Sequence, residues 1–112
     1  MNRVFVYGTL KRGQRNSHFM HCAEFLGQHR TEKNYSMYEF ENYPAVCPQG
    51  SQAIKGEVYH ISDRQFKMLD ELEWYPHFYQ RIEIPTGWGN AWMYIVKFKL
   101  CQGKKQLPGD WP

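Results

Sequence analysis

Glu73 is the residue whose type and position most clearly suggest chemistry. It follows Phe66 and Leu69 at i, i+3 and i+7, so on a helix the three side chains share the stripe that is buried. A buried carboxylate is usually paired, protonated with a raised pKa, or used in catalysis. The alternative is a frayed last turn, with Glu73 pointing to water before Pro76 ends the helix. Asp70, one turn earlier at the edge of the stripe, is the second candidate base.

A second candidate is the loop bracketed by Gly8 and Gly13. Glycine permits unusual backbone angles and the close approach of a ligand, and successive backbone N–H groups in such a loop can form an anion-binding nest. A plain turn would have the same sequence. The loop therefore predicts either a ligand site or an ordinary connection.

Two elements must position these groups. A continuous apolar run over residues 4–7 is typical of a strand buried on both faces, and it leads directly into the glycine loop. Ser62 and Gln65 form a capping box, and Ile61 before the cap can pack on Phe66, which together predict a helix that begins at residue 62. The strand is thus expected to position the loop, and the helix is expected to position Glu73.

The rest of the chain predicts an α+β fold with a small curled sheet or barrel. Asn16 and Gly27 suggest the two ends of a second helix, with Cys22 in the core. Residues 48–51 are expected to form a turn, and residues 101–112 an irregular tail. Strands are expected at residues 35–40, 45–47, 54–61, 78–84 and 91–98, the last two as a hairpin. In the hairpin, Tyr79 and Arg81 face the same way, and Arg81 is expected to point to solvent.

Length and composition limit the function classes. A chain of 112 residues with 42% hydrophobic and 17% aromatic residues predicts a single folded domain over residues 1–112. The net charge of +3 comes from scattered residues and not from a basic stripe, so nucleic acid is not an expected partner. No stretch is apolar enough for a membrane span and no signal peptide is expected, so no membrane partner is predicted.

Cysteine and histidine usage adds two further expectations. Cys22, Cys47 and Cys101 lack C-x-x-C spacing and predict free thiols in a reducing cytoplasm. His18 and His21 with Cys22 could be zinc ligands, but four ligands are needed and no matching pair occurs elsewhere. We therefore expect neither a metal nor a cofactor.

Four short motifs resemble the gamma-glutamylcyclotransferase-like family, and in particular its gamma-glutamylamine cyclotransferase branch. The opening run over residues 4–14 is similar to the start of that family. The other three follow in the same order and together with it span most of the chain. They are residues 56–59, residues 69–73 with Pro76 and residues 79–81, and residues 91–94.

The resemblance implies a small mixed β-barrel with two short helices. It also implies an enzyme that acts on a small-molecule gamma-glutamyl substrate and releases 5-oxoproline and an amine or amino acid. By motif match, the catalytic glutamate is Glu73, and the substrate-binding residues are Tyr7, Gly8, Thr9, Leu10 and Tyr79.

In the implied reaction the substrate's own α-amine attacks its γ-carbonyl, so a base and an anion cradle suffice. The loop would bind either the α-carboxylate or the oxyanion, and Tyr79 would either orient Glu73 or line the pocket. Arg81 could also attract the substrate carboxylate. The family often has glycine after the glutamate, where this chain has Trp74, so the choice of substrate stays open. A binding module of the same fold that lacks turnover is the alternative function.

Overall fold

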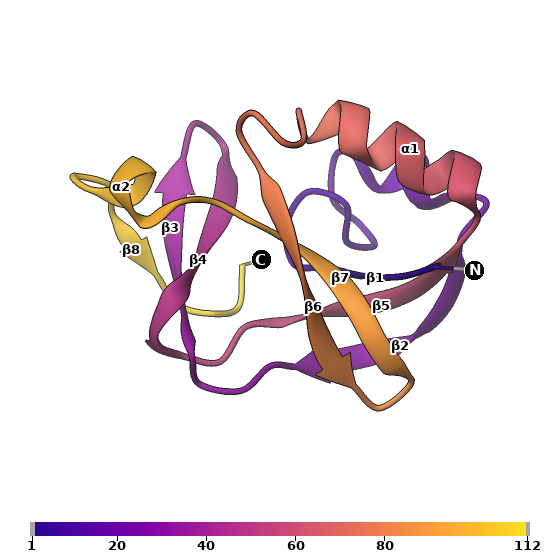
Figure 1. Ribbon diagram of the computed structural model, residues 1–112, viewed down its shortest axis with the longest axis horizontal. Coiled ribbons are helices and arrows are strands. Elements are labelled where there is room, and N and C mark those ends of the chain that lie inside the picture. The colour runs from indigo at the N-terminus through magenta and orange to yellow at the C-terminus, as the bar shows by residue number, and fades with distance from the viewer. Residues whose placement is uncertain (1, 112) are drawn as a thin grey trace.

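The computed structural model describes residues 2–111, which form two β-sheets, two α-helices and one 3₁₀ helix (Figure 1). The elements in chain order are β1 (Asn2–Val6), η1 (Ser17–Met20), β2 (Glu24–Arg30), β3 (Tyr35–Phe40), β4 (Tyr43–Gln52), β5 (Lys55–Ile61), α1 (Asp63–Leu72), β6 (Gln80–Thr86), β7 (Gly89–Ile95), α2 (Phe98–Cys101) and β8 (Gln106–Leu107). The predicted α+β class is confirmed.

The larger sheet is mixed, and its strand order is β2-β5-β1-β7-β6. β1 lies at its centre, antiparallel to β5 and parallel to β7. Val4, Phe5 and Val6 are buried, as expected for a central strand. The predicted hairpin is also present, because β6 and β7 pair antiparallel from Gln80 with Ile95 to Thr86 with Gly89.

The smaller sheet has the order β4-β3-β8 and lies to the left of the larger one in Figure 1. A backbone hydrogen bond of 2.9 Å from the Val96 N–H to the Val46 carbonyl joins the two sheets. The expected barrel is not confirmed, because over residues 2–111 the strands form two separate sheets and no single closed one. The expected turn over residues 48–51 is wrong, since β4 runs through it.

Helix α1 begins as its capping box predicts. The Ser62 hydroxyl accepts from the Gln65 N–H, and the Gln65 side chain accepts from the Ser62 N–H. The helix lies beside the larger sheet with its first turn near the start of β1, where the Asn2 side chain donates to Asp63 (Figure 1). It ends at Leu72, one residue before Glu73.

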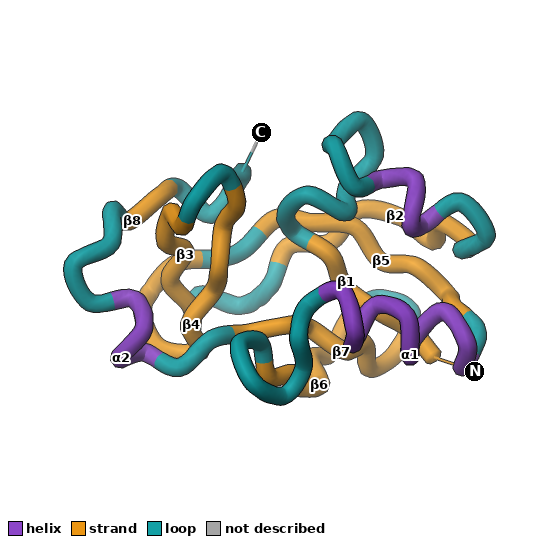
Figure 2. The backbone as a smooth tube through the Cα atoms, turned by 90° about the horizontal axis from the view of Figure 1, so that it is seen from above, coloured by secondary structure: helices purple, strands orange, loops and turns teal. Residues whose placement is uncertain are grey.

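The predicted helix over residues 16–27 is wrong. Only Ser17–Met20 is helical, as a 3₁₀ turn, and Glu24–Arg30 forms β2 on the edge of the larger sheet (Figure 2). Pairing with β5 overrides the helical spacing of the apolar residues. Gly27, expected to close a helix, lies at a register shift, where an added Cβ would approach the Trp88 ring to 2.5 Å. Cys22 is consequently exposed and not in the core.

The expectation of an irregular tail is partly wrong, since α2 ends at Cys101 and β8 pairs with β3. All three cysteines are free thiols, as predicted. In the part of the chain that the structure describes, none of the helices has the length and apolarity needed to cross a membrane.

Candidate active site

A cavity of about 430 Å³ lies where the two sheets and the end of α1 meet. The end of β1 and the glycine loop form one wall, the start of β4 forms another, and the segment after α1 forms a third. The lining residues are Phe5, Val6, Tyr7, Gly8, Thr9, Leu10, Arg15, Asn16, Tyr43, Pro44, Leu72, Glu73, Trp74, Phe78, Tyr79 and Tyr94. All six residues predicted for the site, Glu73 and five substrate-binding residues, are among them.

The glycine loop turns tightly after β1. The Lys11 N–H donates to the Gly8 carbonyl at 3.1 Å, and the Asn16 N–H donates to the Thr9 carbonyl at 3.0 Å. Within residues 2–111 the backbone N–H groups of Thr9 and Leu10 donate to no protein acceptor. Such free donors at a cavity wall can bind a carboxylate or an oxyanion.

The requirement for glycine at position 8 differs from the one expected. Its backbone is not in the left-handed region, whereas Gly13 has φ 83°. A Cβ at Gly8 would lie 2.9 Å from the Pro44 side chain, so a side chain there would collide with the start of β4. Gly8 therefore allows the loop to pack against the smaller sheet.

Glu73 lies directly after α1, as the C-terminal cap residue, and its N–H donates to the Leu69 carbonyl at 2.9 Å. Glu73 was expected inside the helix, but it lies one residue beyond the end of the helix. Its half-buried side chain nevertheless lines the cavity. Leu72, the last residue of α1, is 39% exposed. Burial raises the pKa of Glu73 to about 7, because the cavity stabilises the neutral acid.

Four tyrosines line the same cavity as Glu73, and the hydroxyls of three of them, Tyr7, Tyr79 and Tyr94, donate to protein acceptors. Tyr7 donates to the Tyr94 carbonyl at 2.9 Å, and Tyr79 donates to the Pro44 carbonyl at 3.0 Å. Burial and then the nearby Glu73 carboxylate raise the pKa of Tyr7. Tyr79 therefore lines the cavity, while its hydroxyl joins the segment before β6 to the start of β4.

Asp70, the second candidate base, is already engaged. The Arg81 guanidinium donates twice to its carboxylate, at 3.0 and 3.1 Å, and the Tyr94 hydroxyl donates at 2.7 Å. Arg81 also lies over the rings of Phe66 and Tyr75, at 4.3 Å from each centroid. The expectation of a solvent-facing Arg81 is wrong, since its side chain is 17% exposed. Neither Asp70 nor Arg81 lines the cavity.

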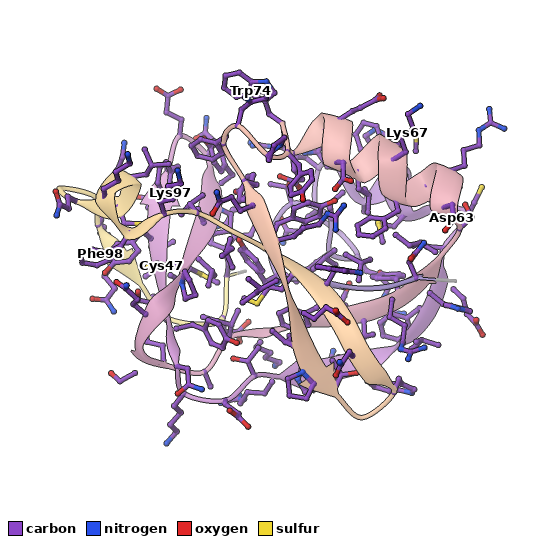
Figure 3. All side chains as sticks on the ribbon, in the orientation of Figure 1. Cys47, Asp63, Lys67, Trp74, Lys97 and Phe98 are labelled. Carbon is purple, nitrogen blue, oxygen red and sulfur yellow. The ribbon has the colours of Figure 1, made fainter. Side chains whose placement is uncertain are left out.

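Trp74 projects from the segment after α1, away from both sheets (Figure 3). The side chain is 64% exposed, and the backbone has φ 53°, in the left-handed region that favours glycine. The tryptophan lies at the rim of the cavity and does not fill it.

In the described residues no three His, Cys, Asp or Glu side chains are grouped to hold a metal ion. His18, His21 and Cys22 instead line a separate surface pocket beside α1.

Sequence reasoning missed several residues of the cavity wall: Arg15, Asn16, Tyr43, Pro44, Phe78 and Tyr94. Tyr94 had a signal, because it belongs to the run over residues 91–94 that resembles a family motif. Tyr43 and Pro44 had none, since their place in the wall depends on the packing of one sheet on the other.

Comparison with known proteins places the chain among relatives of similar length. The family model described as gamma-glutamyl cyclotransferase, AIG2-like, matches residues 4–112. A relative from Vibrio cholerae is 40% identical over 108 residues, which are 96% of this chain and 93% of that protein. The gamma-glutamylcyclotransferase family protein YtfP of Escherichia coli is 38% identical over 109 residues, 97% of this chain and 95% of that protein.

A solved structure shares the fold. An uncharacterized protein from Pyrococcus horikoshii aligns with a TM-score of 0.83 at 32% identity, over 98% of this chain and 89% of that one.

Proposed function

This chain belongs to the gamma-glutamyl cyclotransferase, AIG2-like family, and we propose that it converts gamma-glutamyl compounds into 5-oxoproline and a free amine or amino acid. The observation that carries the proposal is Glu73, a carboxylate with a pKa of about 7 in a cavity that is also lined by residues with free backbone N–H groups. A base poised near neutral pH can both accept and return a proton.

In the proposed reaction Glu73 takes a proton from the substrate's α-ammonium group. The freed amine nitrogen attacks the γ-carbonyl carbon, a C–N bond closes the five-membered ring, and the C–N bond to the leaving amine breaks. Of the three protons on the α-nitrogen, one stays on the ring nitrogen and two reach the leaving amine through Glu73. The balance needs no oxidant and no enzyme nucleophile.

The loop supplies the second part of the proposed mechanism. The free N–H groups of Thr9 and Leu10 bind the substrate α-carboxylate or the oxyanion that forms at the γ-carbonyl. Tyr7 and Tyr79, whose hydroxyls bond to backbone carbonyls, form fixed walls that hold the amine near the carbonyl. General acid–base catalysis of this kind is worth about 10²–10⁴-fold, and positioning adds to it.

The test is incubation of the purified protein with a panel of gamma-glutamyl amines and gamma-glutamyl peptides, with 5-oxoproline measured by mass spectrometry. We expect release from at least one compound, in stoichiometric amounts with the free amine. Calorimetric binding of these compounds with no 5-oxoproline would instead identify a binding module that keeps the fold and the cavity without turnover.

A further inference from the structure

The rim of the cavity carries a cation that the proposed mechanism does not use. Arg15 and Glu73 are the two charged side chains among the cavity-lining residues of the described chain. Glu73 is half-buried, whereas Arg15 is exposed. Over residues 2–111 Arg15 forms no ion pair with a protein carboxylate, unlike Arg12, Lys55 and Arg81.

The backbone around Arg15 is held against the loop. The neighbouring Asn16 donates its backbone N–H to the Thr9 carbonyl and its side-chain amide to the Thr9 hydroxyl, both at 3.0 Å. The Ser17 N–H donates to the Gln14 carbonyl at 3.0 Å. Arg15 therefore stands at a fixed place on the rim, with only its side chain free to move.

Several polar side chains of the cavity already have protein partners. The hydroxyls of Tyr7, Tyr79 and Tyr94 donate to protein acceptors, and the Thr9 hydroxyl accepts from Asn16. A ligand carboxylate at the rim would therefore meet the Arg15 guanidinium as its natural partner. Guanidinium groups bind carboxylates with two parallel hydrogen bonds.

Because Glu73 is half-buried and Arg15 is exposed, the two side chains are expected to contact different parts of the substrate. If Glu73 receives the α-ammonium group, the glutamyl part occupies the inner cavity beside the glycine loop, and the leaving group extends toward the exposed rim. The cation at the rim then faces the leaving group.

We propose that Arg15 forms a subsite for a carboxylate on the leaving group, so that the preferred substrates are gamma-glutamyl amino acids or peptides and not simple gamma-glutamyl amines. This inference rests on the proposed cyclotransferase function. It names a substrate class within that function.

The test compares two compounds that differ by one carboxylate, gamma-glutamylalanine and gamma-glutamylethylamide, in the native protein and in Arg15→Gln. We expect the native protein to favour gamma-glutamylalanine in kcat/KM, and Arg15→Gln to reduce this preference by about three-fold or more, the scale of one exposed ion pair. The preference should also shrink in 1 M salt, where the screening length falls to about 3 Å.

Arg64→Gln is the matched control, because Arg64 is an exposed arginine on α1 that lines the separate pocket and not the cavity. It should keep the native preference.

An equal fall in kcat/KM for both compounds in Arg15→Gln would overturn the inference, because Arg15 would then bind the glutamyl carboxylate. An unchanged preference would overturn it too, while release of 5-oxoproline from both compounds would leave the proposed function standing. No release from either compound would count against the proposed function itself.

Discussion

Glu73 lies in a position that favours the neutral acid, and its acid–base behaviour follows from that. Burial alone accounts for its raised pKa of about 7, against an ordinary value of 4.5, and no hydrogen bond or ion pair to described residues offsets it. Asp70, one helical turn away, shows the opposite situation, since Arg81 and Tyr94 occupy its carboxylate. The Glu73 carboxylate is thus free to exchange a proton with a substrate, whereas the Asp70 carboxylate is held by its hydrogen bonds within the protein.

We predict two opposite pH dependences from Glu73. The carboxylate must be ionised to act as a base, so kcat/KM for 5-oxoproline release should rise with pH through about 7. The folded state holds the proton more tightly than the unfolded one, so its stabilising contribution is full below pH 4.5 and is lost as pH rises through about 7. Urea unfolding at pH 5 and pH 8 checks the second effect.

Glu73→Gln serves as the reference, because it has no carboxylate to titrate. The native protein should lose more stability between pH 5 and pH 8 than this variant does. An equal change in both proteins would mean that the Glu73 carboxyl titrates at its ordinary pKa.

Single residues were predictable from the sequence where the local pattern carried the information. Glu73 stood out as a polar residue on an apolar stripe, and Tyr79 and the glycine loop followed from short motifs. Arg15 carried no such signal, because an isolated arginine in a loop is usually a solvated surface residue. Gly8 was singled out, but its actual neighbour, Pro44, comes from the other sheet.

At the scale of elements, the glycine loop is tied to β5 through a buried acid. Glu57 is 8% exposed, and one of its oxygens accepts from the Arg12 N–H at 2.9 Å and from the Tyr59 hydroxyl at 3.0 Å. The Arg12 guanidinium lies 4.0 Å from the other oxygen. These contacts hold the far end of the loop, whose near end lines the cavity.

We predict that Glu57→Ala loosens this loop. The Arg12 N–H and the Tyr59 hydroxyl would lose their acceptor, at a cost of about 1–3 kcal/mol, which lowers Tm by several degrees. Misplacement of the loop should also lower kcat/KM by about ten-fold. Calorimetric melting and 5-oxoproline release measure the two effects.

Glu57→Gln separates the loop effect from the loss of charge, because its amide oxygen can accept both hydrogen bonds. It should stay near the native protein in kcat/KM. If Gln and Ala reduce kcat/KM equally, the acceptor at position 57 does not set the loop.

Elements were predictable where the local sequence and the tertiary structure agreed. The capping box fixed the start of α1, and the alternation of residues fixed the β6–β7 hairpin. The helix predicted over residues 16–27 was wrong. The apolar residues there have helical spacing, but Glu24–Arg30 instead pairs as a strand with β5. That pairing joins segments about thirty residues apart, which no local pattern records.

At the scale of the whole molecule, the cavity exists because two sheets meet beside the end of α1. Strand β1 pairs with β7 in parallel, and the Tyr79 hydroxyl reaches Pro44 in the other sheet. The α+β class was predictable from the mixture of strands and helices. The division into two sheets was not, because it depends on long-range contacts such as that between Val46 and Val96.

We propose that Glu73 is the acid–base group of a cyclotransferase. The most direct test is 5-oxoproline release by Glu73→Gln, which keeps the shape of the side chain and removes the proton acceptor. We predict a fall of about 10²-fold or more, with the fold retained. Asp70→Asn, measured in parallel, should keep most of the activity. Native turnover in Glu73→Gln together with its loss in Asp70→Asn would contradict the account and identify Asp70 as the base.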